Sequence, residues 1–255
     1  MNNIFSTENL TLLLSYPFKD PAWKKKLLIG MMLMLLSCLL FMIPSIFIFG
    51  YGARIAKKVA DEGGDPVLPE WDDWGGLFVD GLRILVVCLV VSLPVMVFIL
   101  SGFFIISGST FLPALFSDPQ SSEMSPQLIL IPLLGMLLAS LLILVGTVFS
   151  LVTSVFSPAI VTHVAVKKSI AALFKVGDWW SIWRANMSGF FLCLVFVFCV
   201  SFAFSIVYQF ISVLAVLCCP LYFVVVGAAG LYLILVFYAL YAQVYRQGVL
   251  KLTEQ

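Results

Sequence analysis

The stretch from Gly50 to Arg83, GYGARIAKKVADEGGDPVLPEWDDWGGLFVDGLR, decides how this chain folds because it is the longest polar interval between apolar runs. It carries seven of the thirteen acidic residues, four of the fourteen basic residues and two of the six tryptophans. The whole chain is 62% hydrophobic and 11% charged, whereas soluble domains carry about 25% charged residues. Such a chain cannot hide its apolar surface in a water-soluble core, so we expect an integral membrane protein.

Apolar runs that are long enough to cross a bilayer recur along the rest of the chain. A helix needs about 20 residues to cross roughly 30 Å of hydrocarbon. By this criterion we expect four full spans, at residues 82–106, 127–156, 189–213 and 221–241. Three polar segments are expected to carry interfacial helices, at residues 1–26, 50–81 and 157–188. The predicted fold is all-α, with residues 1–255 forming a single membrane domain: a polytopic helical membrane bundle with interfacial cytoplasmic helices.

One further apolar run, residues 27–49, has two interpretations. Its flanks, Lys24 to Lys26 before it and Arg54 to Lys58 after it, both resemble cytoplasmic sequence, yet the run is long enough for only one straight crossing. Pro44 lies in its last third, and a proline kinks or breaks a helix by removing a backbone hydrogen bond. We favour an N-terminal re-entrant hairpin whose two half-helices meet near Pro44. The alternative is a fifth span, kinked at Pro44, with the N-terminus outside.

The charges are distributed unevenly between the two sides of this predicted bundle. If segments 1–26, 50–83 and 157–188 share one compartment with the short hydrophilic C-terminal tail, which contains Arg246 and Lys251, all fourteen Lys and Arg residues lie in it. The opposite side keeps only Asp118 and Glu123, in a predicted outer loop at residues 107–126. Because basic residues mark cytoplasmic loops, we expect a multi-pass protein of the inner (cytoplasmic) cell membrane with its N- and C-termini in the cytoplasm.

Four signatures give the chain a resemblance to a known family. They are YPFKDPAWKKKLLIG (16–30), GYGARIAKKVA (50–60), LPEWDDWGGLFVDGLR (68–83) and LYAQVYRQG (240–248). Over nearly the whole chain, it resembles an uncharacterised prokaryotic multi-pass membrane family, domain of unknown function 4013. The resemblance implies a membrane location and a helical fold. It implies no activity, substrate or catalytic residue.

Two clusters on the predicted cytoplasmic side are candidate sites for binding lipid or a protein partner. Basic residues near an anionic leaflet gain about 1 kcal/mol each. The plainer interpretation is anchoring of the interface by tryptophans and capping of a helix by Asp72 or Asp73. The candidate residues are Trp71, Asp72, Asp73 and Trp74 in the PEWDDW box, and Lys167, Lys168, Trp179, Trp180, Trp183 and Arg184 in the segment 157–188.

The sequence offers little for catalysis or metal binding. His163 is the only histidine, the acidic residues of the segment 50–81 do not follow the spacing of an EF-hand, and no Walker loop, G-x-S-x-G or H-E-x-x-H pattern occurs. We therefore expect no enzyme activity, no catalytic residue, no metal, no cofactor and no nucleic-acid partner. The vicinal pair Cys218 and Cys219, near an expected outer turn, is interpreted as structural.

Two functions fit these observations. The first is a non-enzymatic membrane protein that binds membrane lipids, a protein partner or another copy of itself through the two clusters. The alternative is a channel or transporter for a small neutral solute. Its helices would be broken at Pro44, Pro94, Pro132 and Pro220 and would line a route past Ser37, Ser92, Ser140, Thr147 and Ser201. No ionisable side chain lies in the middle of a predicted span, which argues against ion-coupled transport. We favour the binding protein.

Overall fold

The computed structural model describes residues 4–116, 126–215 and 219–254. These residues form helices and no strand, which confirms the predicted all-α fold. Asp118, Glu123 and Cys218, which the sequence analysis placed in outer turns, lie outside the described residues. The helices are α1 (Thr7–Lys19), α2 (Trp23–Leu39), α3 (Ser45–Glu62), α4 (Trp74–Phe116), α5 (Pro126–Lys167), α6 (Ala171–Phe174), α7 (Val176–Ala185), α8 (Met187–Ala215) and α9 (Cys219–Thr253).

Four of the described helices are long and apolar enough to cross a membrane: Trp74–Leu112, Ile129–Lys167, Met187–Ser212 and Tyr222–Thr253. They overlap the four predicted spans, and the prediction of a polytopic helical bundle is confirmed. The helices are longer than predicted, however. α4 begins at Trp74 instead of near Leu82, and α5 continues to Lys167, so parts of two expected polar segments are extensions of membrane helices.

Two predicted breaks and one predicted loop are absent from the described residues. α4 continues through Pro94 and α5 continues through Pro132. Residues 107–116, expected in a loop, continue α4, and their hydroxyl groups bond within the helix: Ser107 Oγ donates to the Phe103 carbonyl at 2.8 Å and Thr110 Oγ1 to the Ile106 carbonyl at 2.9 Å. Back-bonding of this kind satisfies a hydroxyl without leaving the helix.

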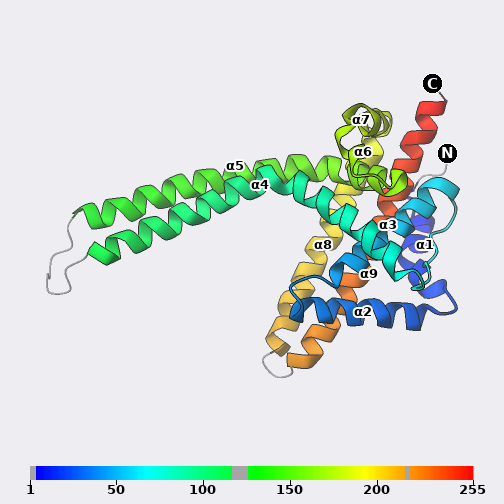
Figure 1. The fold of residues 1–255 in the computed structure, drawn as a ribbon, viewed down its shortest axis with the longest axis horizontal. Coiled ribbons are helices and arrows are strands. Elements are labelled where there is room, and N and C mark those ends of the chain that lie inside the picture. The colour runs from blue at the N-terminus through cyan, green and yellow to red at the C-terminus, as the bar shows by residue number, and fades with distance from the viewer. Residues whose placement is uncertain (1–3, 117–125, 216–218, 255) are drawn as a thin grey trace. The chain divides into compact units, whose positions relative to one another are not determined.

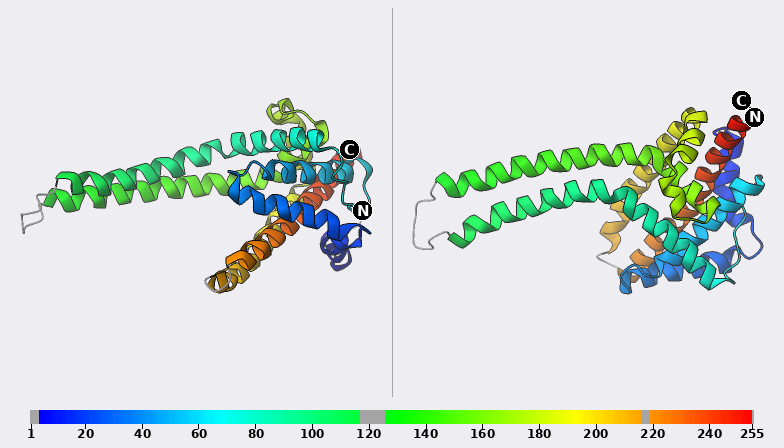
Figure 2. Two further views of the ribbon diagram at one scale, coloured as in Figure 1. Left: turned by 60° about the horizontal axis from the view of Figure 1, so that its bottom comes forward. Right: turned by 45° about the horizontal axis from the view of Figure 1, so that its top comes forward.

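Contacts divide the chain into two compact units, Leu89–Ser154 and the remainder, Met1–Cys88 with Val155–Gln255. Within Leu89–Ser154, α4 and α5 run side by side (Figures 1 and 2). Small residues permit the approach, since a Cβ built on Gly102 would lie 2.8 Å from Ile143 and one on Gly146 would lie 2.9 Å from Ile99. No described residue of this unit is charged at neutral pH.

In the larger unit, α9 is the central helix. α1, α2, α3, α7 and α8 all pack against it. Its buried side chains include Leu235, Val236, Ala239 and Leu240, each fully shielded from solvent. Small residues on α3 bring that helix close, because a Cβ built on Gly52 would lie 2.7 Å from the Tyr238 ring. The core of this unit is thus built around the last helix of the chain.

The run at 27–49 is broken as the hairpin interpretation predicts. α2 ends at Leu39 and α3 begins at Ser45, directly after Pro44, and both helices run from the turn toward the same side of the unit (Figure 2, left). Backbone hydrogen bonds join the turn to the end of α2: Leu40 N donates to Leu36 O and Met42 N donates to Ser37 O, both at 2.9 Å. The arms are longer than the predicted half-helices, since 17 residues give α2 a length of about 26 Å.

α3 and the first turns of α4 cross at a pair of glycines. A Cβ built on Gly81 would lie 2.9 Å from Gly50 N and closer still to the Ile46 carbonyl oxygen. A Cβ built on Gly50 would in turn collide with the Leu77 carbonyl oxygen. Because the neighbours are backbone atoms, which cannot rotate away, this crossing accepts only glycine at both positions.

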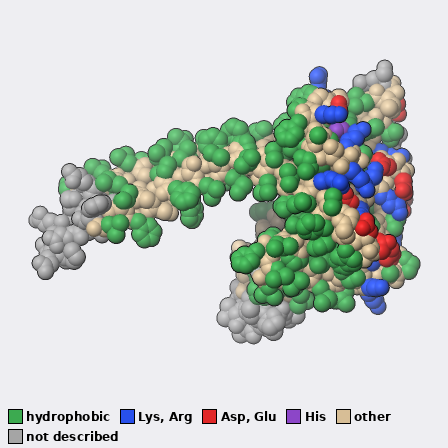
Figure 3. All heavy atoms as spheres, in the orientation of Figure 1, with side chains coloured by type: hydrophobic (Ala, Val, Ile, Leu, Met, Phe, Trp, Pro, Cys, Tyr) green, Lys and Arg blue, Asp and Glu red, His purple; other side chains and the backbone are tan. Residues whose placement is uncertain are grey.

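The charged side chains of the larger unit gather on one side. Figure 3 shows Lys, Arg, Asp and Glu over the ends of α3 and α9, the loop before α4, and α7, while hydrophobic side chains cover the rest of the unit in that view. This is the distribution expected of a membrane protein with one polar face, because charged groups are costly in hydrocarbon.

Candidate functional site

The PEWDDW box is docked onto α2 and α3 by its first tryptophan. The Trp71 ring stacks on Tyr51 with 4.1 Å between centroids, and its Nε1 donates to the Lys26 carbonyl at 3.1 Å. The Tyr51 hydroxyl donates to the Pro69 carbonyl at 2.7 Å. Trp71 is 9% exposed. Its position therefore indicates a structural role, holding the loop against the hairpin.

A buried lysine fixes the same loop from the other side. Lys26 is 5% exposed, and its Nζ lies 2.8 Å from Asp20 Oδ2 and 2.6 Å from Glu70 Oε1. It also donates to the Leu68 carbonyl at 3.0 Å. Although burial lowers the pKa of the Lys26 ammonium, the two carboxylates raise it by more, so the net shift is upward. The cation thus joins the start of α2 to the loop that precedes α4.

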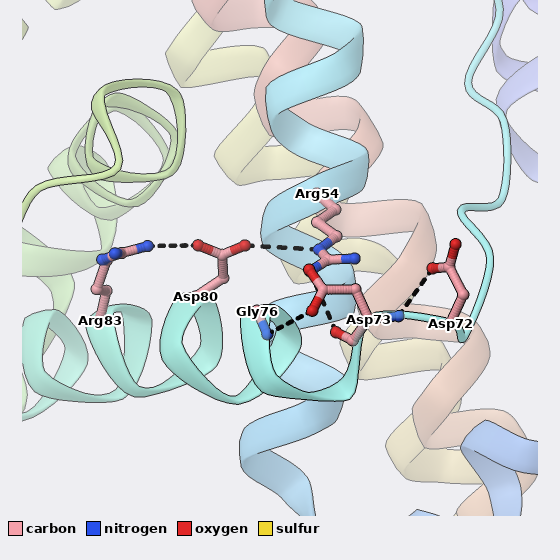
Figure 4. A network of polar contacts seen from close by, with 6 residues as sticks. All are labelled: Arg54, Asp72, Asp73, Gly76, Asp80 and Arg83. Carbon is pink, nitrogen blue, oxygen red and sulfur yellow. Dashed lines mark hydrogen bonds and ion pairs between the residues drawn. The ribbon is translucent and has the colours of Figure 1, made fainter.

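Asp73 caps α4, as one of the two alternatives in the sequence predicts. Its Oδ1 accepts from Gly76 N at 2.9 Å, and its Oδ2 lies 2.6 Å from Arg54 Nη2 (Figure 4). Arg54 Nε lies 3.5 Å from Asp80, which also pairs with Arg83 at 2.5 Å. Arg54 therefore ties α3 to Asp73 and Asp80 at the start of α4, and Arg83 pairs with Asp80 within α4. Asp72 stays exposed, and its Oδ1 accepts from Asp73 N at 2.9 Å.

The cap makes a prediction about acid stability. The Gly76 amide and then the Arg54 guanidinium hold the pKa of Asp73 below its usual value of 3.8. A carboxyl with a lowered pKa in the folded state stabilises the fold above its unfolded pKa, and this contribution is lost as pH falls through the folded pKa. We expect Asp73→Ala to lower the melting temperature at pH 7 more than at pH 3, measured by tryptophan fluorescence in detergent.

The control for that experiment is Asp73→Asn, which keeps a capping oxygen but cannot titrate. We expect its melting temperature to exceed that of Asp73→Ala at both pH values. An Asp73→Ala protein that loses equal stability at pH 3 and pH 7 would contradict a role for the ionised cap.

The second predicted cluster is built on α7. Trp179, Ile182 and Trp183 follow the helical spacing of one face, are buried, and pack near Phe156, whose ring centroid lies 4.9 Å from that of Trp183. Trp179 Nε1 donates to the Leu173 carbonyl at 3.1 Å. The helix is thereby held on its aromatic side. Two of the three predicted tryptophans, Trp179 and Trp183, point inward.

The other side of this region is exposed and carries both bases and apolar side chains. Phe174 is 67% exposed, Val176 53% and Trp180 38%. Within the described residues, no ion pair involves the four bases nearby, all of which are exposed. We call this surface the α7 face. It comprises Lys167, Lys168, Phe174, Lys175, Val176, Trp180 and Arg184.

The ten predicted site residues thus fall into two groups with different surroundings. In the PEWDDW box, Trp71 and Asp73 are engaged in the fold, while Trp74 is 42% exposed beside Phe47. On the α7 side, Lys167, Lys168, Trp180 and Arg184 remain accessible. In the part of the chain that the structure describes, no three His, Cys, Asp or Glu side chains gather as a metal site would require.

Three cavities of the larger unit differ in what they can hold. One between Arg54, Lys57, Asp80, Arg83 and Lys168 measures about 10 Å³, which is enough for one water molecule and too small for a larger ligand. An apolar groove of about 330 Å³ lies between α1, α2 and α9 beside Trp23 and Lys24. The third, of about 380 Å³, is lined by Ile4, Asn9, Val59, Gly63, Gly64, Asp65, Gln243, Arg246, Gln247 and Leu250.

The third cavity escaped the sequence analysis, which placed Arg246 in a short hydrophilic tail. The signals that point to it are the Gly63-Gly64 pair after α3 and the signature LYAQVYRQG, which contains the arginine. Neither shows that residues 4–9, 59–65 and 243–250 meet.

Comparison with known proteins gives one match. The family model described as Protein of unknown function (DUF4013) matches residues 32–213, which include the hairpin, the PEWDDW box, α7 and most of α8. No curated protein and no solved structure matches the chain.

Proposed function

Because this chain belongs to the DUF4013 family of unknown function, we propose that it is a non-enzymatic integral membrane protein that binds anionic lipid headgroups at the α7 face. One observation carries the proposal. Four exposed bases without an ion pair in the described structure flank three exposed apolar side chains, on a short segment between two apolar membrane helices, α5 and α8.

The position of the segment supports a lipid as the ligand. α5 ends at Lys167 and α8 begins at Met187, so the residues between them are expected at the level where two membrane helices leave the hydrocarbon. Tryptophan rings favour this level of the membrane. Lysine and arginine near an anionic leaflet gain about 1 kcal/mol each, or about 4 kcal/mol for four.

The charge distribution supports the cytoplasmic side of the inner membrane as the location of this face. All fourteen Lys and Arg residues belong to segments expected on one side, and in the view of Figure 3 Lys and Arg gather on one side of the larger unit. Because basic segments are retained in the cytoplasm, both termini belong there too. The cytoplasmic leaflet is also the one with anionic surface potential.

The alternative function, a path for a small neutral solute, has weaker support. Several hydroxyl groups expected along the path bond within their own helices: Ser37 Oγ donates to Leu33 O at 2.7 Å and Thr147 Oγ1 to Ile143 O at 2.8 Å. Pro94 and Pro132 expose no broken helix end. These contacts favour lipid binding over solute passage.

The test is retention of phosphatidylglycerol by the purified protein. The protein is reconstituted in nanodiscs that contain phosphatidylcholine and phosphatidylglycerol, and bound lipids are counted by native mass spectrometry after gentle release. We expect the variant K167Q/K168Q/K175Q/R184Q to retain at least about tenfold less phosphatidylglycerol than the wild type, since the four charges contribute several kcal/mol.

The matched control is K167R/K168R/K175R/R184K, which keeps every charge and is expected to retain phosphatidylglycerol as the wild type does. Equal retention by the neutral variant and the wild type refutes the proposal. Loss in both variants would also count against it, because simple headgroup attraction depends on charge and not on the type of base.

A further inference from the structure

Arg246, near the end of α9, has a buried guanidinium nitrogen without an acceptor. Its Nη1 atom is shielded from solvent and has no hydrogen-bond partner in the described structure. A charged donor left unpaired in a buried position is costly. The described residues leave this charged donor without an acceptor.

Arg246 also lines the cavity of about 380 Å³, which lies between the start of α1 and the ends of α3 and α9. Small-molecule sites occupy about 300–1,000 Å³, so the volume is sufficient for a small solute. The walls are of mixed character, with Ile4 and Val59 on the apolar side and Gln243 and Asp65 on the polar side. Such walls orient a small ligand that has one polar and one apolar side.

A glycine turn shapes the wall beside the guanidinium. Gly63 and Gly64 have φ values of 72° and 80°, which lie in the left-handed region that favours glycine. A Cβ built on Gly63 would lie 2.6 Å from Arg246 Nη2 and closer to Nη1. The turn therefore lets backbone press against the guanidinium, and any side chain at position 63 would displace it.

The charges of the lining define the ligand. Arg246 contributes one positive charge and Asp65 one negative charge, and among the described residues that line the cavity no other is ionisable. A guanidinium pairs well with carboxylate or phosphate oxygens, and a carboxylate accepts hydrogen bonds from hydroxyl or amino groups. A ligand with one anionic group and a nearby hydroxyl or amino group can therefore pair with Arg246 and donate a hydrogen bond to Asp65.

We propose that this cavity binds a monoanion that also carries a hydroxyl or amino donor. The anion pairs with Arg246, and the donor reaches Asp65. Both a free hydroxy acid and a lipid headgroup of the phosphatidylglycerol type have this chemistry. The site is separate from the α7 face and does not depend on it.

The experiment compares three related solutes on the purified protein in detergent. The melting temperature is measured by tryptophan fluorescence. In two titrations, sodium lactate or sodium propionate replaces sodium chloride at constant ionic strength. In a third titration, the neutral lactamide is added. We expect a saturable rise with lactate, a smaller one with propionate, which lacks the hydroxyl, and none with lactamide, which lacks the charge. A parallel titration with dihexanoylphosphatidylglycerol is made on the K167Q/K168Q/K175Q/R184Q variant, so that the α7 face does not contribute. The ligand that binds this variant more tightly, lactate or the lipid, identifies the source.

Two variants test the assigned residues. Arg246→Gln is expected to weaken the lactate response at least about tenfold, the loss typical of a charged hydrogen bond. Asp65→Ala, in an exposed loop, is expected to bring the lactate and propionate affinities together and to strengthen propionate binding by roughly two- to fivefold, since one partly screened like charge is removed. Lys25→Gln, at an exposed base that belongs to neither site, is the charge-matched control and is expected to respond to lactate as the wild type does.

The proposal is overturned if Arg246→Gln responds to lactate as strongly as the wild type. It is also overturned if neither lactate nor the lipid gives a saturable shift up to about 50 mM, well above millimolar affinity. If Arg246→Gln does not fold, Arg246→Lys keeps the charge without the forked donor and is expected to bind lactate more weakly. Asp65→Ala tests the predicted contact with the hydroxyl group and does not depend on whether the Arg246 variants fold.

Discussion

Gly81→Leu is expected to separate α3 from α4 and to destabilise the protein by about 3 kcal/mol or more, at the upper end of what overpacking costs. The new side chain meets the Ile46 carbonyl and the Gly50 amide, which belong to the backbone and cannot rotate away. The helices must move apart, and the Arg54 contacts with Asp73 and Asp80 across the same crossing are lost with them. The measurement is unfolding by sodium dodecyl sulfate in mixed micelles.

Gly75→Leu provides a matched control in the first turn of the same helix. A Cβ at Gly75 has no neighbour within 4 Å. Because leucine is a better helix former than glycine by up to about 1 kcal/mol, this variant is expected to be at least as stable as the wild type. Unfolding of both variants at the same detergent fraction would show that the glycine crossing does not limit the approach of the two helices.

Lys26→Met is expected to cost about 3–5 kcal/mol, because breaking a buried ion pair leaves an uncompensated charge. The charge left behind is Asp20, whose side chain is 9% exposed. The Leu68 carbonyl also loses its donor. The PEWDDW loop should then loosen, which can be followed as faster hydrogen exchange at residues 68–72 and as a lower melting temperature.

Lys25→Met separates this effect from the general loss of a lysine. Lys25 is exposed and adjacent in sequence, so the change should stay within about 0.5 kcal/mol. The double variant Asp20→Asn/Lys26→Met should recover part of the loss, since the stranded carboxylate is gone. A Lys26→Met protein as stable as Lys25→Met would rule out the ionic lock at the start of α2.

The sequence predicts the number and order of the membrane helices because hydropathy alone determines which segments can lie in hydrocarbon. It also predicts a cap by Asp72 or Asp73, since Asp before an apolar helical pattern is a strong local signal, but it does not choose between the two. The helix ends are harder to predict. Residues 107–116 contain Gly, Ser and Pro, and residues 74–81 contain Gly, and these residue types favour loops in water. Both segments nevertheless belong to α4, where the hydroxyl groups of Ser107 and Thr110 donate to carbonyl groups of the same helix.

The candidate sites show the same limit. Tryptophan both anchors an interface and fills a core, so the sequence could not show that Trp71, Trp179 and Trp183 turn inward while Trp180 is half-exposed. The Arg246 cavity is assembled from three segments, of which the first two, at residues 4–9 and 59–65, lie far in the sequence from the third, at residues 243–250. No local pattern reports such a meeting, because it depends on α1 and α3 packing against α9.

The docking of α1 has a consequence for the order in which the chain can be completed during synthesis. The Tyr16 hydroxyl donates to the Leu235 carbonyl at 3.0 Å, and the Tyr232 hydroxyl donates to the Leu14 carbonyl at 2.8 Å. α1 is therefore held by α9, a helix more than 200 residues later in the sequence. A nascent chain that stops before residue 232 lacks the helix on which α1 docks, so α1 can reach its docked position only after α9 has been made.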